Sequence, residues 1–165
     1  MCGECFGSHI CTREDDFNRL FEKLTTPDRL IWVVPHYEPL PSKMLILTEN
    51  MEEMVFLGWC ANTDYRFPLA GKPVGIIAHG GQSAPEALPY YQKVLVEPLA
   101  MAFASCQMQV TGLDADHPHG VSFGITDIKK RPNSLFVDIS HDWDEIRQRI
   151  APLVSRVGAA SVGAQ

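Results

Sequence analysis

Histidine, tyrosine and glycine residues follow two short apolar runs, and their types suit the binding of a flat ring. The runs are residues 30–34 and 74–78. A tyrosine offers a flat face, and glycines let backbone N–H groups come close to the polar edge of a ring. A histidine at such a place could contact a ligand or transfer a proton near neutral pH. The candidate ligand-binding residues are Pro35, His36, Tyr37, Ser42, His79, Gly80, Gly81 and Gln82.

The same two motifs have a structural alternative. Pro-x-Tyr and Gly-Gly also occur as turns that simply end strands, and loop histidines often face water. Parallel strands place their following loops side by side at one edge of a sheet. We therefore expect residues 35–42 and 79–83 to lie together at one end of the sheet and to form its main cleft. Loops at opposite ends of the sheet would exclude the ligand-binding interpretation.

Three of the five cysteines lie within the first eleven residues, which favours metal or redox chemistry in a reduced compartment over a disulfide framework. Cys2, Cys5, His9 and Cys11 could form a tetrahedral Cys₃His zinc site, because the Cys-x-x-Cys spacing lets two thiolates face one ion. Free thiols, or a disulfide between two of the three, are the alternatives.

A second group of metal-ligating types follows residue 112. Asp114, Asp116, His117 and His119 suit Zn²⁺ or Mn²⁺, whereas a solvated loop is the alternative. The remaining cysteines, Cys60 and Cys106, are expected to be buried or half-buried small residues.

The elements that must position these residues alternate between helix and strand. The expected elements are a helix over 17–24 after Asp15-Asp16, a strand at 30–34, a helix from Ser42 that turns Met44, Leu47, Met51, Met54 and Val55 inward, a strand at 74–78, a helix over 85–104 that Pro89 and Pro98 kink or divide, and a strand at 108–111. The first strand is apolar throughout, which predicts helices on both of its faces. This order predicts an α/β fold with a mostly parallel sheet.

Beyond residue 112 the pattern is less regular. Residues 121–126 and 134–139 are expected to be extended, with a turn at Pro132-Asn133 between them. A final helix begins at Ser140 or Asp142 and buries Trp143, Ile146, Ile150, Leu153, Val154 and Val157. We expect one domain over 1–157 and a flexible tail over 158–165.

These motifs resemble those of the flavodoxin-like NAD(P)H-dependent FMN reductases and the related iron-sulfur flavoproteins. The likeness rests on Pro35-x-Tyr37, Pro41-Ser42, Gly71-Lys72-Pro73, Gly80-Gly81, and the run from Cys2-x-x-Cys5 through Cys11 to Asp15-Asp16. It implies a three-layer sandwich in which the two loops hold the FMN ring. The chain departs from the family where Met44-Leu45 and Glu49-Asn50 replace its Leu-Lys and Asp-Arg pairs, and where Ser8 or His9 stands at a cysteine position.

The resemblance also implies an N-terminally abbreviated fold, because the family opens with a strand and a phosphate-binding loop that have no counterpart before residue 15. The leading hypothesis is an FMN-dependent reductase of flavins or quinone-type acceptors, with NAD(P)H as substrate and Tyr37, Gly80 and Gly81 at the ring. The alternatives are a non-catalytic assembly or regulatory subunit, and a small redox protein that binds zinc or an iron-sulfur cluster through its N-terminal cysteines.

The charge and the apolar content of the chain argue against some classes of partner. A net charge of -6 without a basic block argues against nucleic acid. No apolar run approaches the roughly 20 residues that cross a bilayer, and no basic region precedes an apolar core as in a signal peptide, so we expect a cytoplasmic protein.

The strand at 30–34 should form an edge of the sheet, and an apolar edge strand is seldom left uncovered. We therefore expect a homodimer or larger homo-oligomer that covers this edge and buries Trp32, Met51 and Met54. Failing that, we expect residues 121–139 to cover the edge.

Overall fold

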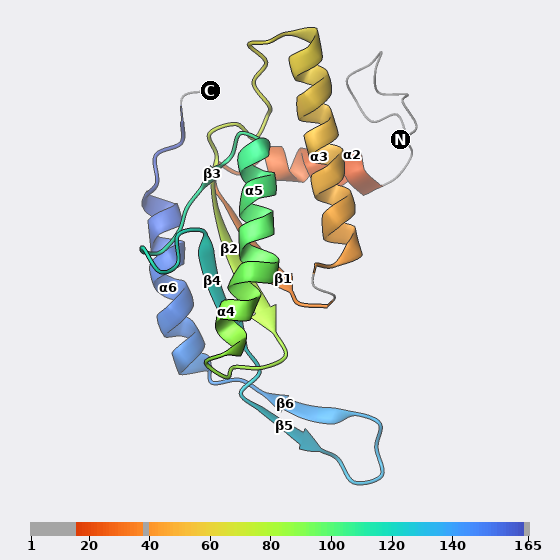
Figure 1. The fold of residues 1–165 in the computed structure, drawn as a ribbon, viewed down its shortest axis with the longest axis vertical. Coiled ribbons are helices and arrows are strands. Elements are labelled where there is room, and N and C mark those ends of the chain that lie inside the picture. The colour runs from red at the N-terminus through yellow and green to blue at the C-terminus, as the bar shows by residue number, and fades with distance from the viewer. Residues whose placement is uncertain (1–15, 38–39, 164–165) are drawn as a thin grey trace.

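The computed structural model describes residues 16–37 and 40–163, and Figure 1 shows a central sheet with helices on both faces. The helices are α2 (Asp16–Thr25), α3 (Ser42–Ala61), α4 (Ala87–Tyr91), η1 (Gln92–Val96, a π-helical segment), α5 (Glu97–Ser105) and α6 (Trp143–Ala159). The strands are β1 (Leu30–Pro35), β2 (Pro73–Gly80), β3 (Gln109–Val110), β4 (Gly120–Gly124), β5 (Asp127–Lys130) and β6 (Val137–Ser140).

The main sheet is parallel and has β2 at its centre. β1 pairs with β2 along its whole length, from Leu30 opposite Val74 to Pro35 opposite His79. On the other side of β2, β3 pairs with its first residues and β4 with its last five. The predicted α/β class with a mostly parallel sheet is therefore confirmed.

Two hydrophobic clusters hold helices to the two faces of this sheet. On one face, Val34, Ile76 and Ala78 pack with buried residues of α3 and of the α4–η1–α5 segment. On the other face, Ile77 and Val121 pack with the buried face of α6. Strand side chains alternate between faces, so β2 contributes to both clusters and is buried along nearly all of its length.

The cover of β1 is incomplete, which corrects one expectation. α6 packs on one face of the sheet, over β2. On that same face of β1, Ile31 is 38% exposed and Val33 is 60% exposed. Ile31 lies near α6. Its Cδ1 atom and the side chain of Val157 on α6 would lie 3.0 Å and 2.8 Å from a Cβ added at Gly75, which is between them. Among the described residues no second helix lies beside α6 to cover the rest of β1.

Two further burial expectations are wrong in α6, although Asp142 begins this helix as predicted. The Asp142 carboxylate accepts hydrogen bonds from the backbone N–H groups of Asp144 and Glu145. Trp143 and Val154 are exposed, because the buried residues of α6 face β2 and β4 and the sides of the helix stay open. In α2, Leu20 is likewise exposed while Phe17 is buried.

The long helix after β2 is interrupted by a π-helical segment, and Pro89 and Pro98 lie in the helical segments on either side of it. α4 and α5 are joined by the π-helical turn η1, at whose end the Glu97 N–H donates to the Gln92 carbonyl five residues earlier. Pro98 lies in the first turn of α5, directly after η1, and it has no N–H to donate to the preceding turn of the helix.

The region after residue 112 differs most from expectation. Residues 120–124 form β4, a buried parallel strand of the main sheet. The antiparallel hairpin consists instead of β5 and β6, and it projects away from the body (Figure 1). The turn at Pro132-Asn133 is present, and Asn133 adopts a φ of 57°, in the left-handed region that asparagine tolerates.

β1 forms an edge of the main sheet in the described part of the chain, as predicted. The expectation that residues 121–139 cover this edge is wrong, because β4 lies on the other side of β2. Met51 is wholly buried inside the core and Trp32 packs on Phe103, with ring centroids 5.2 Å apart. Met51 therefore cannot contribute to a dimer contact.

None of the described helices is long and apolar enough to cross a membrane.

Candidate functional site

The loops after β1 and β2 meet at one edge of the sheet. Pro35 is the register partner of His79, and the His36 N–H donates to the His79 carbonyl at 2.7 Å. The prediction that the two loops lie together is confirmed. The structure thus brings Pro35, His36, Tyr37, His79, Gly80, Gly81 and Gln82 to one place, while Ser42 follows at the start of α3.

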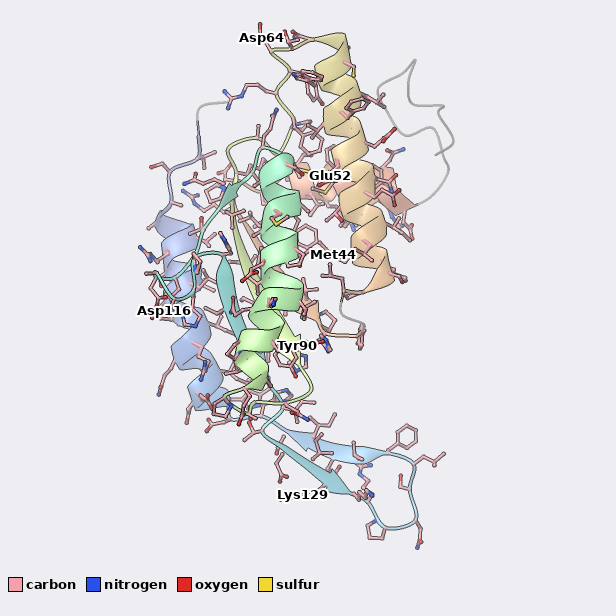
Figure 2. The ribbon with its side chains drawn as sticks, in the orientation of Figure 1. Met44, Glu52, Asp64, Tyr90, Asp116 and Lys129 are labelled. Atoms are coloured by element: carbon pink, nitrogen blue, oxygen red, sulfur yellow. The ribbon has the colours of Figure 1, made fainter. Side chains whose placement is uncertain are left out.

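The first loop presents an exposed aromatic ring beside a more buried imidazole. Tyr37 is 71% exposed and contributes nothing to the core. The His36 ring lies 5.4 Å from the Tyr90 ring and 5.3 Å from the Tyr91 ring. Its Nε2 atom is buried without a hydrogen-bond partner among the described residues. Figure 2 shows Tyr90 on α4, close to this edge.

Ser42 is not the N-cap of α3. Pro41 is the N-cap residue, no side chain accepts a hydrogen bond there, and Ser42 is the exposed first residue of the helix. Ser42 therefore keeps its hydroxyl for other contacts.

The two glycines of the second loop have different environments. A Cβ at Gly80 would overlap the Tyr91 ring, so Gly80 is needed for the packing of that ring. A Cβ at Gly81 would meet nothing within 4 Å. The Tyr91 hydroxyl also accepts a hydrogen bond from the Gln82 N–H at 3.0 Å. Of the two glycines, only Gly81 offers open space for a ligand.

An aromatic group lies on the opposite face of the same edge. His79 Nε2 and His141 Nε2 are 3.2 Å apart. The His79 ring lies 4.8 Å from Phe123, and the His141 ring lies 5.1 Å from Trp143. Burial, followed by the nearby charge of His141, lowers the pKa of His79. A neutral His79 can then accept or donate one hydrogen bond near neutral pH.

Sequence reasoning missed the aromatic residues that surround the loops. These residues are Tyr90, Tyr91, Phe123, His141 and Trp143. The Tyr-Tyr pair soon after the glycine loop was a usable signal, since a helix that returns over the sheet places its first turn beside that loop. Phe123 and His141 could not be found without knowing that β4 pairs with β2.

The other candidate residues stay apart from this edge. Cys2, Cys5, His9 and Cys11 lie outside the described residues. In the loop after β3, the Asp114 carboxylate accepts hydrogen bonds from the N–H groups of Asp116 and His117, and the His117 Nδ1 lies 3.0 Å away. The His117 hydrogen bond lowers the pKa of Asp114. Across the described ranges, no three or more His, Cys, Asp or Glu side chains form a metal-binding group.

The two described cysteines differ in environment. Cys106 is buried as expected, whereas Cys60 is exposed at the end of α3. The latter expectation is therefore wrong. Burial, with the charge of Glu52 second, raises the pKa of the Cys106 thiol to about 12.

A cavity of about 670 Å³ lies beside β3, toward the amino ends of the main strands. It is lined by residues 109–112, 114–115 and 118, and by Arg156, Ala159 and Ala160 of the α6 end. It shares no residue with the two loops, so the expectation that these loops form the main cleft is not borne out by this cavity.

No family model matches this chain, and no curated protein or solved structure matches it significantly. The class of protein therefore follows from the fold and the site alone. It is an α/β protein whose parallel strands carry adjacent loops and aromatic side chains at their carboxyl edge.

Proposed function

We propose that this protein is a flavodoxin-like FMN-binding protein that reduces flavins or quinone-type acceptors with NAD(P)H. The observation that supports the proposal is the hydrogen bond from His36 to His79, which joins the two loops at the carboxyl edge of the parallel sheet. Ligands of open α/β sheets bind at that edge.

The residues at the edge fit the ring of such a cofactor. Tyr37 has a free face large enough to stack on a flat ring, and Gly81 leaves room for a ring edge to approach the backbone. The unpartnered His36 Nε2 is a polar atom that a ligand group or a water would satisfy. Bound FMN would supply the hydride-accepting centre, while these side chains would bind and orient the ring.

The phosphate of FMN has no assigned site in this proposal. Flavin phosphates sit where several N–H groups converge, usually at a helix N-terminus after a strand. The described residues before β1 contain only α2 and the turn that follows it. If the described loops alone hold the cofactor, riboflavin should bind about as tightly as FMN.

The test combines spectra with titration. We expect a purified protein to show flavin absorption, or to quench the fluorescence of added FMN and riboflavin in a saturable way. Tyr37→Ala should weaken binding by about 1 kcal/mol, which is about fivefold in Kd, and Tyr37→Phe should retain it. Oxidation of NADPH in the presence of flavin then tests the reductase activity. Failure to bind either flavin would exclude the proposed function.

A non-catalytic assembly or regulatory subunit is the second candidate, and one observation favours it. Tyr91 fills the space beside Gly80 and accepts the Gln82 N–H, so part of the second loop is used by the protein itself. A colourless protein with no flavin affinity and a stable oligomeric state would support this candidate.

A further inference from the structure

The β5–β6 hairpin carries apolar side chains that no other described part of the chain covers. Each of its strand residues is exposed, and the two strands pack chiefly against each other. Its exposed large apolar residues are Ile128, Leu135, Phe136, Val137 and Ile139, of which Phe136 is 75% exposed. Because a two-stranded hairpin alone is marginally stable in water, such an arm requires a surface to cover it.

α3 offers an exposed apolar stripe of matching character. Leu45, Ile46, Phe56 and Trp59 are each at least half exposed along this 20-residue helix, although its other side is buried in the core. A helix that is apolar on both sides is typical of a buried element. A groove of about 340 Å³ runs along its later turns and is lined by Glu52, Val55, Phe56, Trp59 and Ser105.

The charges of the two surfaces are complementary. The hairpin has the consecutive basic residues 129–131, and Lys130 makes no ion pair with a described residue. α3 carries Glu49, Glu52 and Glu53, and it has no basic residue in its last turn. The negative end of the helix dipole lies at that same end. Both the apolar and the electrostatic features therefore favour a contact between hairpin and helix.

A chain cannot make this contact with itself. Figure 1 shows the hairpin and the later turns of α3 at opposite ends of the molecule, and Figure 2 shows Lys129 and Glu52 correspondingly far apart. A two-fold axis between the ends would bring each hairpin to the α3 groove of a second copy. Two-fold dimers are the commonest closed assemblies, and they make such a reciprocal contact twice.

We propose that two copies of this chain form a two-fold dimer in which each β5–β6 hairpin docks in the α3 groove of the other copy. Leu135 and Phe136 at the tip enter the groove beside Phe56 and Trp59, and Lys130 faces the α3 glutamates. The occupant is a second copy because one chain holds both complementary surfaces. This inference does not depend on flavin binding.

Sedimentation velocity at micromolar concentration tests the dimer. We expect the unaltered protein to be dimeric and the double variant Leu135→Ser, Phe136→Ser to raise the dimer dissociation constant at least about thirtyfold, as loss of a hot spot does. Val154→Ser is the matched control, because Val154 is a 43% exposed apolar residue on α6. A monomeric unaltered protein, or a dimer that the tip variant leaves intact, overturns the proposal.

Charge reversal tests which surface receives the hairpin. Lys130→Glu and Glu52→Lys should each weaken the homodimer, because each variant places two like charges in both contacts. An equimolar mixture of the two variants should recover dimers, since one contact is then reversed and the other is unaltered. If Glu52→Lys leaves the homodimer unchanged, or the mixture stays monomeric, α3 is not the receiving surface. Unchanged circular dichroism confirms that both variants fold.

Discussion

His79 and His141 face each other at the carboxyl edge of the sheet, with their Nε2 atoms 3.2 Å apart. A hydrogen bond between two imidazoles needs one protonated nitrogen and one lone pair, so these two atoms cannot both carry protons and keep the contact. The pair joins the end of β2 to the residue before the Asp142 cap of α6, and its protonation therefore bears on how α6 docks.

The first prediction concerns stability against pH. Burial and the His141 charge lower the folded-state pKa of His79 from its ordinary value of 6.5. The unfolded chain then binds the proton more tightly than the folded one, so this contribution to stability is complete above pH 6.5 and falls as the pH drops toward the lowered pKa. Urea unfolding midpoints at pH 7.5 and at pH 5.5 should show this loss.

His79→Gln should reduce the difference between the two midpoints, because the titrating group is gone. His119→Gln is the control, since His119 is exposed in the loop after β3. An equal pH dependence in the unaltered protein and in His79→Gln would contradict the role of this pair.

The second prediction separates the two loop glycines. Gly80→Ala should destabilise the fold by about 1–3 kcal/mol, because its methyl group would overlap the Tyr91 ring. Gly81→Ala should change the free energy of unfolding by no more than about 0.5 kcal/mol, since its Cβ would meet only open space. Chemical denaturation measures both. Equal effects would show that Tyr91 does not occupy the described position.

The third prediction concerns a buried lysine. Lys72 is 2% exposed, and its ammonium group donates to the carbonyls of Thr25, the last residue of α2, and of Pro27 in the turn that follows. Lys72→Met removes both charge-assisted hydrogen bonds and should cost about 1.5–3 kcal/mol of stability. Lys43→Met, at an exposed position, serves as the control and should be near neutral. A neutral Lys72→Met would mean that water replaces the lysine without loss.

The sequence predicted those elements whose signal is local. β1 and β2 are uninterrupted apolar runs, and α3 and α6 have apolar residues at helical spacing, so each was placed within a few residues. For β4 the sequence predicts only an extended piece over 121–126, because the place of this strand in the sheet depends on pairing with β2, some 40 residues earlier in the chain. The exposure of Val33 and Trp143 could not be predicted either, because it depends on how much of the sheet one helix covers.

For the candidate site, the sequence predicted which loops meet but not what surrounds them. Parallel pairing follows from the order of the elements, and it placed residue 36 beside residue 79. Gly80 was assigned to ligand approach, whereas the structure gives it a packing role against Tyr91. Glycine serves both purposes, and only the coordinates of the neighbouring ring distinguish them.

The last prediction concerns the two described cysteines, which should differ sharply in reactivity. The thiolate is the reacting form, and burial with the Glu52 charge raises the pKa of Cys106 to about 12, so almost no thiolate forms at pH 8. Cys106 is also wholly buried beside the end of α5, whereas Cys60 is exposed. Iodoacetamide at pH 8 should therefore alkylate Cys60 and leave Cys106 unmodified, as peptide mass mapping would show. In 8 M urea both should react, which provides the positive control. Alkylation of Cys106 at a similar rate in the native protein would mean that the end of α5 opens far more readily than its packing against β2 implies.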